Sequence, residues 1–123
     1  MMQVTQVFCK EDTEPRKIKT TAYYQGEITA TGCKPRKGIC ATDRAHLGMT
    51  AIVYADNNGQ IGEILGYWEC LDTGKGSDND GDGVGAIEEG YVVDMYFPTL
   101  EECQEWMRLT EGKIFIQYVE ADG

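Results

Sequence analysis

Residues 50–70 read TAIVYADNNGQIGEILGYWEC, and this stretch predicts a β-hairpin. Residues 50–55 are rich in β-branched and aromatic side chains, a composition typical of strands. Residues 56–59 (DNNG) supply the turn, because Asn and Gly tolerate the positive φ angles that tight hairpins need. Residues 60–70 then return as the partner strand, so an antiparallel pair is expected in the middle of the chain.

Five further stretches have the composition of strands. Thr, Ile, Val and Tyr are frequent in them, and glycine, proline or polar residues separate them. They are residues 17–24, 27–31, 39–42, 91–97 and 113–119. With the hairpin, the chain therefore contains about six or seven short strands, with no visible internal repeat.

One helix is expected, after Pro98. Thr99 is an N-cap residue and Glu102 stands three positions later, the spacing of a capping box. Leu100, Cys103 and Met107 follow at helical spacing, with Trp106 beside them, and Gly112 is placed to end the helix. A single late helix before the last of several short strands favours a small closed β-barrel over a sandwich.

The composition is that of a folded domain and excludes several partners. The chain has 123 residues, a formal net charge of −10, 41% hydrophobic and 26% charged residues, which fits one domain. We expect that domain over residues 17–123, after a polar leader or edge strand at 1–16. The acidic balance argues against nucleic acid and against an anionic membrane surface. No stretch is apolar enough to span a bilayer, and residues 1–5 lack the layout of a secretory signal.

Cysteine spacing leaves two alternatives open. The five cysteines allow at most two disulfides, and no Cys-x-x-Cys pair suggests zinc. Cys33 and Cys40 bracket a turn-rich segment, which makes them the best single disulfide pair. The alternative is that all the cysteines are reduced thiols.

Three aspartates stand where an acid is unusual. Asp72 and Asp94 occur within or beside apolar β-stretches, and Asp43 follows a short one. A charged side chain is poorly suited to such a position, so it is either hydrogen-bonded for structure or held in a cleft with a raised pKa. The residues alone favour the structural interpretation.

The order of four motifs resembles the three-aspartate, or 3D, domain family. The similarity covers residues 23–123, and the last strand also resembles that of short members. The motifs are TAYY at 21–24, ATD at 41–43, LDTG at 71–74 and GYVVDMY at 90–96. The Asp-Thr-Gly triplet also occurs in aspartic proteases, but the strand that follows it there is missing in this sequence.

The resemblance implies a six-stranded double-psi β-barrel, as in the membrane-bound lytic transglycosylase A and the stationary-phase muralytic proteins. Such enzymes cleave the β-1,4 bond between N-acetylmuramic acid and N-acetylglucosamine in peptidoglycan, leave a 1,6-anhydro end and require no cofactor. Asp94 matches the principal acid, and Asp72 and Asp43 match its supporting residues. The resemblance also implies an extracellular or cell-wall location. A two-carboxylate hydrolase with a water nucleophile is the chemical alternative.

Aromatic residues near these motifs are candidates for sugar stacking. Tyr23, Tyr24 and Tyr91 are the expected substrate-binding residues. The alternative is that they pack in the core, where aromatic side chains of a small barrel usually lie.

An acidic, glycine-rich loop separates the last two motifs. Residues 78–89 match D-x-D-x-D-G-x5-E in every defined position. Calcium would be held by Asp78, Asp80, Asp82, the carbonyl of Val84 and Glu89. The alternative is an acidic loop without metal, since no helix pair flanks it.

Three classes of function therefore remain at this stage. The first is a lytic transglycosylase-like enzyme that acts on peptidoglycan glycan strands. The second is a non-catalytic module of the same fold that binds wall glycan or is stabilised by calcium. The third is an intracellular acidic interaction protein.

Overall fold

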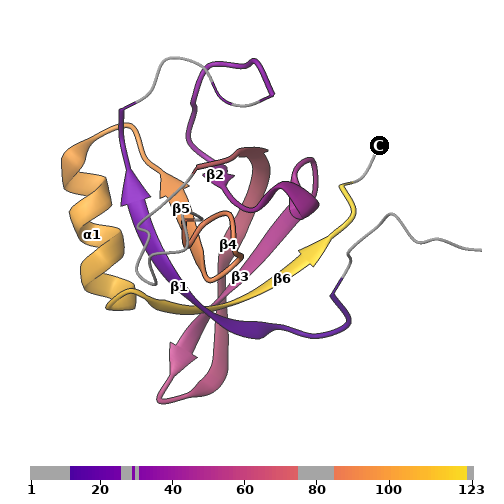
Figure 1. Ribbon diagram of the computed structural model, residues 1–123. Helices are drawn as coiled ribbons and strands as arrows, with labels where there is room; N and C mark the ends of the chain where they lie inside the picture. The colour runs from indigo at the N-terminus through magenta and orange to yellow at the C-terminus, as the bar shows by residue number, and fades with distance from the viewer. Residues whose placement is uncertain (1–11, 26–28, 30, 75–84, 122–123) are drawn as a thin grey trace, which may run out of the picture.

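The computed structural model describes residues 12–25, 29, 31–74 and 85–121, and these form six strands and one α-helix (Figure 1). A single 3-10 turn, η1 (Arg44–His46), follows the second strand. The other elements are β1 (Arg16–Tyr23), β2 (Ile39–Ala41), β3 (Thr50–Asn57), β4 (Gln60–Asp72), β5 (Val92–Tyr96), α1 (Leu100–Thr110) and β6 (Lys113–Val119). The expectation of a mostly β chain with one helix before the last strand is confirmed.

The six strands close into a ring in the order β1-β5-β2-β4-β3-β6, with β6 paired back to β1. The β1–β5 and β2–β4 pairs are parallel, and the other four pairs are antiparallel. Closure leaves no free sheet edge, which is the physical advantage of such a ring. It also brings strands that are distant in sequence side by side.

The ring has an internal two-fold symmetry of connection. Exchanging β1 with β4, β2 with β5 and β3 with β6 maps every strand pair onto a pair of the same direction. The β2–β5 and β3–β6 pairs map onto themselves. The sequence shows no matching repeat, so the symmetry lies in the topology alone.

The predicted hairpin is present as β3 and β4. Asn58 and Gly59 connect the strands with φ angles of 54° and 88°, which a two-residue turn of type I′ requires. The amide of Gly59 donates to Asp56 Oδ1 at 2.6 Å. Both strands extend beyond their predicted ends. Strand β3 continues to Asn57, which pairs with Gln60 beside the turn, and β4 continues to Asp72, which pairs with Ala41 of β2.

Two predictions near the N-terminus have a partial outcome. The expected strand at 27–31 falls mostly outside the described residues, and Thr29 and Thr31 are not in a strand. The leader at 1–16 is described only from Asp12 onward. Asp12 hydrogen-bonds with Tyr118 through two backbone amides and with Gln117, so this end of the leader lies along β6.

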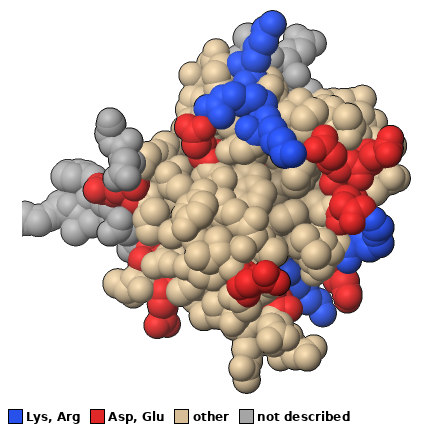
Figure 2. Space-filling model, turned by 180° about the vertical axis from the view of Figure 1, so that it is seen from behind, with Lys and Arg blue, Asp and Glu red and all other residues tan. Residues whose placement is uncertain are grey.

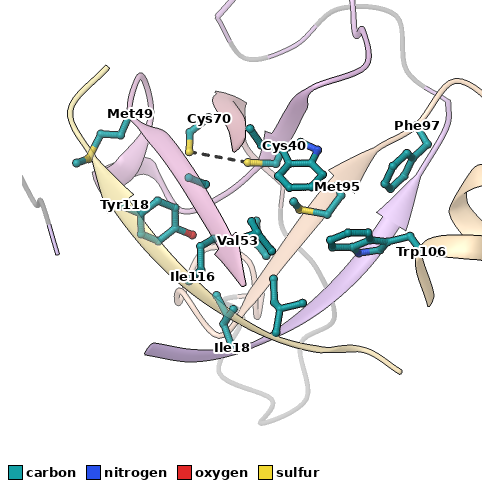
Figure 3. Close-up of a cluster of buried hydrophobic side chains, with 14 of the residues drawn as sticks. Ile18, Cys40, Met49, Val53, Cys70, Met95, Phe97, Trp106, Ile116 and Tyr118 are labelled. Carbon is teal, nitrogen blue, oxygen red and sulfur yellow. Dashed lines mark hydrogen bonds between the residues drawn. The ribbon is translucent and has the colours of Figure 1, made fainter. Parts of the chain in front are cut away.

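A single cluster of apolar side chains fills the interior of the ring (Figure 3). Strand residues alternate between this cluster and the outer face: Ile18 and Thr20 of β1 are buried, while Lys19 and Thr21 are exposed. Helix α1 lies beside β1 (Figure 1), and its Trp106 belongs to the cluster (Figure 3). The helix thereby covers apolar surface that the strands leave open.

The start of α1 is capped as the sequence predicts. Thr99 Oγ1 accepts a hydrogen bond from the amide of Glu102 and donates one to its carboxylate, both at 3.2 Å. The helix ends at Glu111, the C-cap residue, with φ of 54°, followed by Gly112 with φ of 78°. No helix in the described part of the chain is long and apolar enough to cross a membrane.

Loss of the cap is expected to destabilise the protein modestly. Thr99→Ala removes the acceptor for an amide that has no partner within the helix, which costs about 1 kcal/mol. The free energy of unfolding in urea measures this loss. Thr99→Ser keeps the hydroxyl and serves as the control. Equal stability of the Ala and Ser variants would contradict the role of the cap.

The structure corrects the predicted disulfide. Cys33 and Cys40 are free thiols, because Cys40 points into the core from β2 while Cys33 lies in a surface loop, hydrogen-bonded to Thr29. The sulfur of Cys40 instead lies 3.8 Å from that of Cys70 (Figure 3). This contact, together with burial, raises the pKa of the Cys40 thiol.

Candidate active site

Four residues form a row across neighbouring strands of the ring. Thr21 of β1 pairs with Asp94 of β5, Asp94 pairs with Ala41 of β2, and Ala41 pairs with Asp72 of β4. The pairing skips Leu71, a bulge that brings Asp72 into the row. Because the residues next to Asp94, Val93 and Met95, are buried in the core, the row lies on the outer face of the ring.

Ring closure therefore places Asp94 and Asp72 on the same face of the sheet. Two strand spacings, roughly 10 Å, separate their backbones. The sequence predicted that these acids come together, and the register of β5, β2 and β4 agrees. Neither side chain is sealed in the interior, since both remain partly exposed.

Among the described carboxyl groups, Asp94 has the most strongly shifted pKa. Its pKa is raised from the ordinary 3.8 to about 6. Burial is the largest cause, a hydrogen bond from Thr21 Oγ1 at 2.9 Å opposes it, and the charge of Asp72 adds to the increase. A carboxyl group of this pKa is partly protonated near neutral pH, so it can both donate and accept a proton.

Asp72 is held by donors from two sides. The hydroxyl of Tyr23 donates to Oδ2 at 3.1 Å, and the amide of Thr73 donates to Oδ1 at 2.9 Å. Burial, the charge of Asp72 and the charge of Asp94 raise the pKa of Tyr23, so its hydroxyl stays protonated and remains a donor. The ring of Tyr23 packs edge-on against Tyr96, with 5.3 Å between centroids, which fixes this donor.

A pocket of about 540 Å³ opens beside Asp94. This volume lies within the range of small-molecule sites. A larger pocket of about 1020 Å³ adjoins it and shares several of its walls. Of the three predicted acids, Asp94 alone lines either of these two pockets, as far as the chain is described. The smaller pocket is lined by Asp94, Thr21, Thr20, Lys19, Ala86, Ile87, Val92, Glu111, Gly112 and Lys113.

Asp43 takes no part in the electrostatic interaction between Asp94 and Asp72. Its carboxylate is buried and lies 2.8 and 2.9 Å from Nδ1 of His46. His46 stacks on Tyr118 at 3.8 Å between centroids, and the Tyr118 hydroxyl bonds Thr42. Burial raises the pKa of Asp43, but the hydrogen bond and charge of His46 outweigh it, so the pKa is lowered. Asp43 thus has the environment of a structural carboxylate, not that of an acid catalyst.

The lowered pKa of Asp43 gives a pH-dependent stability. The ionised carboxylate stabilises the fold fully above the ordinary pKa of 3.8, and this contribution is lost as the pH falls through the lower folded-state pKa. Asp43→Asn is therefore expected to cost about 1–2 kcal/mol near pH 7 and less near pH 3. Urea unfolding at both pH values measures the difference. A cost that is equal at both pH values would contradict this account.

The predicted substrate and metal residues are distributed over several places. Tyr23 contacts Asp72, Tyr24 is exposed after the end of β1, and Tyr91 is 64% exposed and lines the larger pocket.

Asp78, Asp80, Asp82 and Val84 lie outside the described residues, so the calcium loop stays a prediction. Glu89 is described, and its amide donates to the carbonyl of Gly85. In the described ranges, no group of three carboxylate, His or Cys side chains is arranged to hold a metal.

Three residues at this site were not predicted from the sequence. Thr21 belongs to a quoted motif, but its contact with Asp94 depends on the parallel pairing of β1 with β5. Lys19 and Lys113 line the same pocket and are far apart in sequence. Their only sequence signal is that each is directly followed by a β-branched residue on a strand, which is too common to identify a site.

The arrangement can support chemistry by one acid with a raised pKa, assisted by a second carboxylate. The face seen in Figure 2 is mostly uncharged, with acidic side chains scattered over it and a group of basic side chains near its upper edge. Comparison of the chain with protein-family models, curated proteins and solved structures finds no match. The assignment of function therefore depends on the geometry and protonation of Asp94 and its neighbours.

Proposed function

We propose that this protein cleaves peptidoglycan glycan strands as a lytic transglycosylase-like enzyme, with Asp94 as the single general acid and base. The observation that carries the proposal is the pKa of Asp94, raised to about 6 in a side chain that lines an open pocket. Such perturbed acids in pockets are characteristic of catalytic sites. Cleavage of this substrate places the protein at the bacterial cell wall.

The proposal includes the fold: a double-psi β-barrel of the three-aspartate type. The order and direction in which the strands pair support it. The parallel pairs β1–β5 and β2–β4 are related by the internal two-fold symmetry of the ring, and the β2–β5 pair lies on its axis. Asp94 of β5 pairs with Ala41 of β2 at this central position. The motifs around Asp43, Asp72 and Asp94 in this chain resemble those of that family.

In the proposed reaction, protonated Asp94 donates its proton to the glycosidic oxygen as the bond from that oxygen to C1 of the N-acetylmuramic acid breaks. The resulting Asp94 carboxylate then takes the proton of the 6-hydroxyl group of the same sugar. The 6-oxygen forms a bond to C1, which gives the 1,6-anhydro end and returns Asp94 to its protonated form. No water is consumed, and a single carboxyl group serves both steps.

The neighbouring groups support the two forms of Asp94 that this cycle needs. Burial and, to a smaller extent, the charge of Asp72 favour the protonated acid before cleavage, whereas the hydrogen bond from Thr21 favours the carboxylate afterwards. Tyr23 holds Asp72 in place. Asp43 contributes by position, since its carboxylate lies next to Gly90, which leads into β5.

Incubation of the purified protein with peptidoglycan sacculi tests the proposal. Mass spectrometry is expected to detect soluble muropeptides with 1,6-anhydro ends. Products with a reducing end would instead indicate a water nucleophile and the two-carboxylate hydrolase. Sedimentation of the protein with sacculi, without any product, would overturn the enzymatic proposal in favour of a non-catalytic glycan-binding module.

A further inference from the structure

Two lysines are paired directly across neighbouring strands beside the acid. Lys19 of β1 and Lys113 of β6 are register partners, and both side chains are exposed. Like charges in directly opposed positions of an antiparallel pair destabilise the sheet. Both lysines line the pocket of about 540 Å³ that contains Asp94. Their placement is unfavourable for folding alone, which suggests a role for the charge.

Within the described part of the chain, neither lysine forms an ion pair. Among the described residues, no carboxylate lies within 4.0 Å of Lys19 or Lys113, the distance that defines an ion pair. Other basic residues do have such partners: Arg36 pairs with Glu69, and Lys37 with Glu102. In a chain of net charge −10, two adjacent cations with no ion-pair partner among the described residues form a local site for an anion.

The charge of the pocket changes with the proton on Asp94. Among the described residues that line it, the charged or titratable ones are Lys19, Lys113, Asp94 and Glu111. With Asp94 protonated, two lysines stand against one glutamate, so these lining residues carry a net positive charge in the form that the proposed reaction requires. An anionic ligand is then attracted to the pocket, whereas a neutral sugar gains nothing from the lysines.

We propose that Lys19 and Lys113 bind a carboxylate carried by the lactyl arm of the sugar, so that the substrate is an acidic, arm-bearing glycan and not a neutral one. This inference rests on the proposed function and names its substrate class. The carboxylate belongs either to the lactyl group itself, where no peptide is attached, or to the peptide linked to it. Both sources present the same group to the lysines.

The geometry separates this subsite from the reacting bond. Lys19 lies two residues before Thr21 on the same face of β1, and Thr21 contacts Asp94. Two residues of strand span roughly 7 Å. The lysines therefore lie beside Asp94 at a distance suited to a substituent of the sugar, while Asp94 faces the bond that is cleaved.

Binding measurements in the Asp94→Asn background test the subsite without turnover. The ligands are muramyl dipeptide, N-acetylmuramic acid with its free lactyl carboxylate, and a neutral N-acetylglucosamine tetramer, each titrated by NMR. Lys19→Gln combined with Lys113→Gln is expected to weaken binding of the carboxylate ligands about five- to tenfold and to leave the neutral ligand unaffected. Added salt is expected to weaken carboxylate binding in the protein that keeps both lysines, and not in the Lys19→Gln, Lys113→Gln double variant.

Lys17→Gln is the matched control. Lys17 lies on the same strand, is also exposed, and lines the larger pocket but not the one with Asp94. Equal losses in Lys17→Gln and in the double variant would overturn the subsite, because the effect would then be general electrostatics. Unchanged binding in the double variant, or equal affinity for the neutral tetramer and the carboxylate ligands, would overturn it too.

The two proposals fail in different ways. If sacculi yield anhydro products but the double variant binds normally, the lysine subsite is wrong and the proposed activity stands. If no products form but carboxylate binding depends on the lysines, the activity is wrong and the chain is an acidic-sugar binder. Tighter binding of the peptide-free sugar than of the dipeptide identifies the lactyl carboxylate as the bound group, and preference for the dipeptide identifies the peptide carboxylate. Equal, lysine-dependent binding of both shows that the lysines accept either carboxylate.

Discussion

Asp94→Asn is expected to reduce the release of 1,6-anhydro muropeptides from sacculi by about 10²–10⁴-fold, the usual contribution of a general acid–base group. An amide neither donates the proton to the glycosidic oxygen nor accepts one from the 6-hydroxyl. Because Asp94 must be protonated for the first step, the wild-type rate is expected to fall as the pH rises through about 6. Product formation over a range of pH, followed by mass spectrometry, measures both effects.

Stability provides the control for this variant. The folded-state pKa of Asp94 is raised from 3.8 to about 6, so ionisation disfavours the fold, and stability is lost as the pH rises between these values. Asp94→Asn removes that charge. The variant is therefore expected to be more stable than the wild type near pH 7, by on the order of 2 kcal/mol, and similar to it near pH 3. Inactivity in a protein of at least normal stability excludes unfolding as the cause.

Thr21→Val sharpens the same test. It removes the hydrogen bond from Thr21 Oγ1 that favours the ionised form of Asp94. The pKa of Asp94 then rises further, and the pH at which the rate falls is expected to shift upward. A fully active Asp94→Asn variant, or a wild-type rate that increases from pH 6 to 8, would contradict the role of Asp94.

Trp106→Ala is expected to have the largest effect on stability, a loss of about 3–5 kcal/mol. The indole is 6% exposed and packs against Trp68 and Phe97, with centroid distances of 5.3 and 5.7 Å. Its Nε1–H donates to Thr20 Oγ1 at 3.0 Å, which joins α1 to β1. Truncation leaves a cavity and a hydroxyl without its donor. Since whole domains are stable by only about 5–15 kcal/mol, the variant approaches unfolding.

Two further variants separate packing from hydrogen bonding at this position. Trp106→Phe keeps much of the aromatic contact but loses the donor to Thr20, so it is expected to cost about 1–2 kcal/mol. Leu109→Ala changes an apolar residue of the same helix that is 63% exposed, and a loss below about 1 kcal/mol is expected. Chemical denaturation measures all three variants. A loss in Leu109→Ala as large as that in Trp106→Ala would show that the helix, and not its buried indole, determines the effect.

Local features of the sequence were sufficient to predict the helix and the six strands of the structure, although Thr29 and Thr31, expected in a further strand, are not in one. The β3–β4 hairpin follows from a turn that only Asn and Gly accommodate easily, and α1 begins at Thr99 because its hydroxyl satisfies a free backbone amide. The strand-forming stretches at β1, β2, β5 and β6 were also found within a few residues of their ends. These features depend on neighbours a few positions apart.

The acids could be named from the sequence, but their environments could not. Asp94 and Asp72 lie in one row because a bulge at Leu71 and a parallel pair join β2 to β4. Asp43 was expected beside them, yet it is held by His46, three residues later, and its pKa is shifted in the opposite direction. A charge in a β-stretch indicates that something must stabilise it, without indicating which partner does so.

Local chemistry in this protein therefore specifies the hairpin, the capped helix and the unusual aspartates. Closure of the ring determines which distant side chains come into contact. It pairs β1 with β5 and with β6, so that Thr21 lies against Asp94 and Lys19 lies opposite Lys113. It also places Cys70, and not Cys33, next to Cys40. The physical reason is that register between distant strands is selected by burial of the whole core at once. No short segment contains that information, because a shift of one residue would exchange the buried and exposed faces of an entire strand.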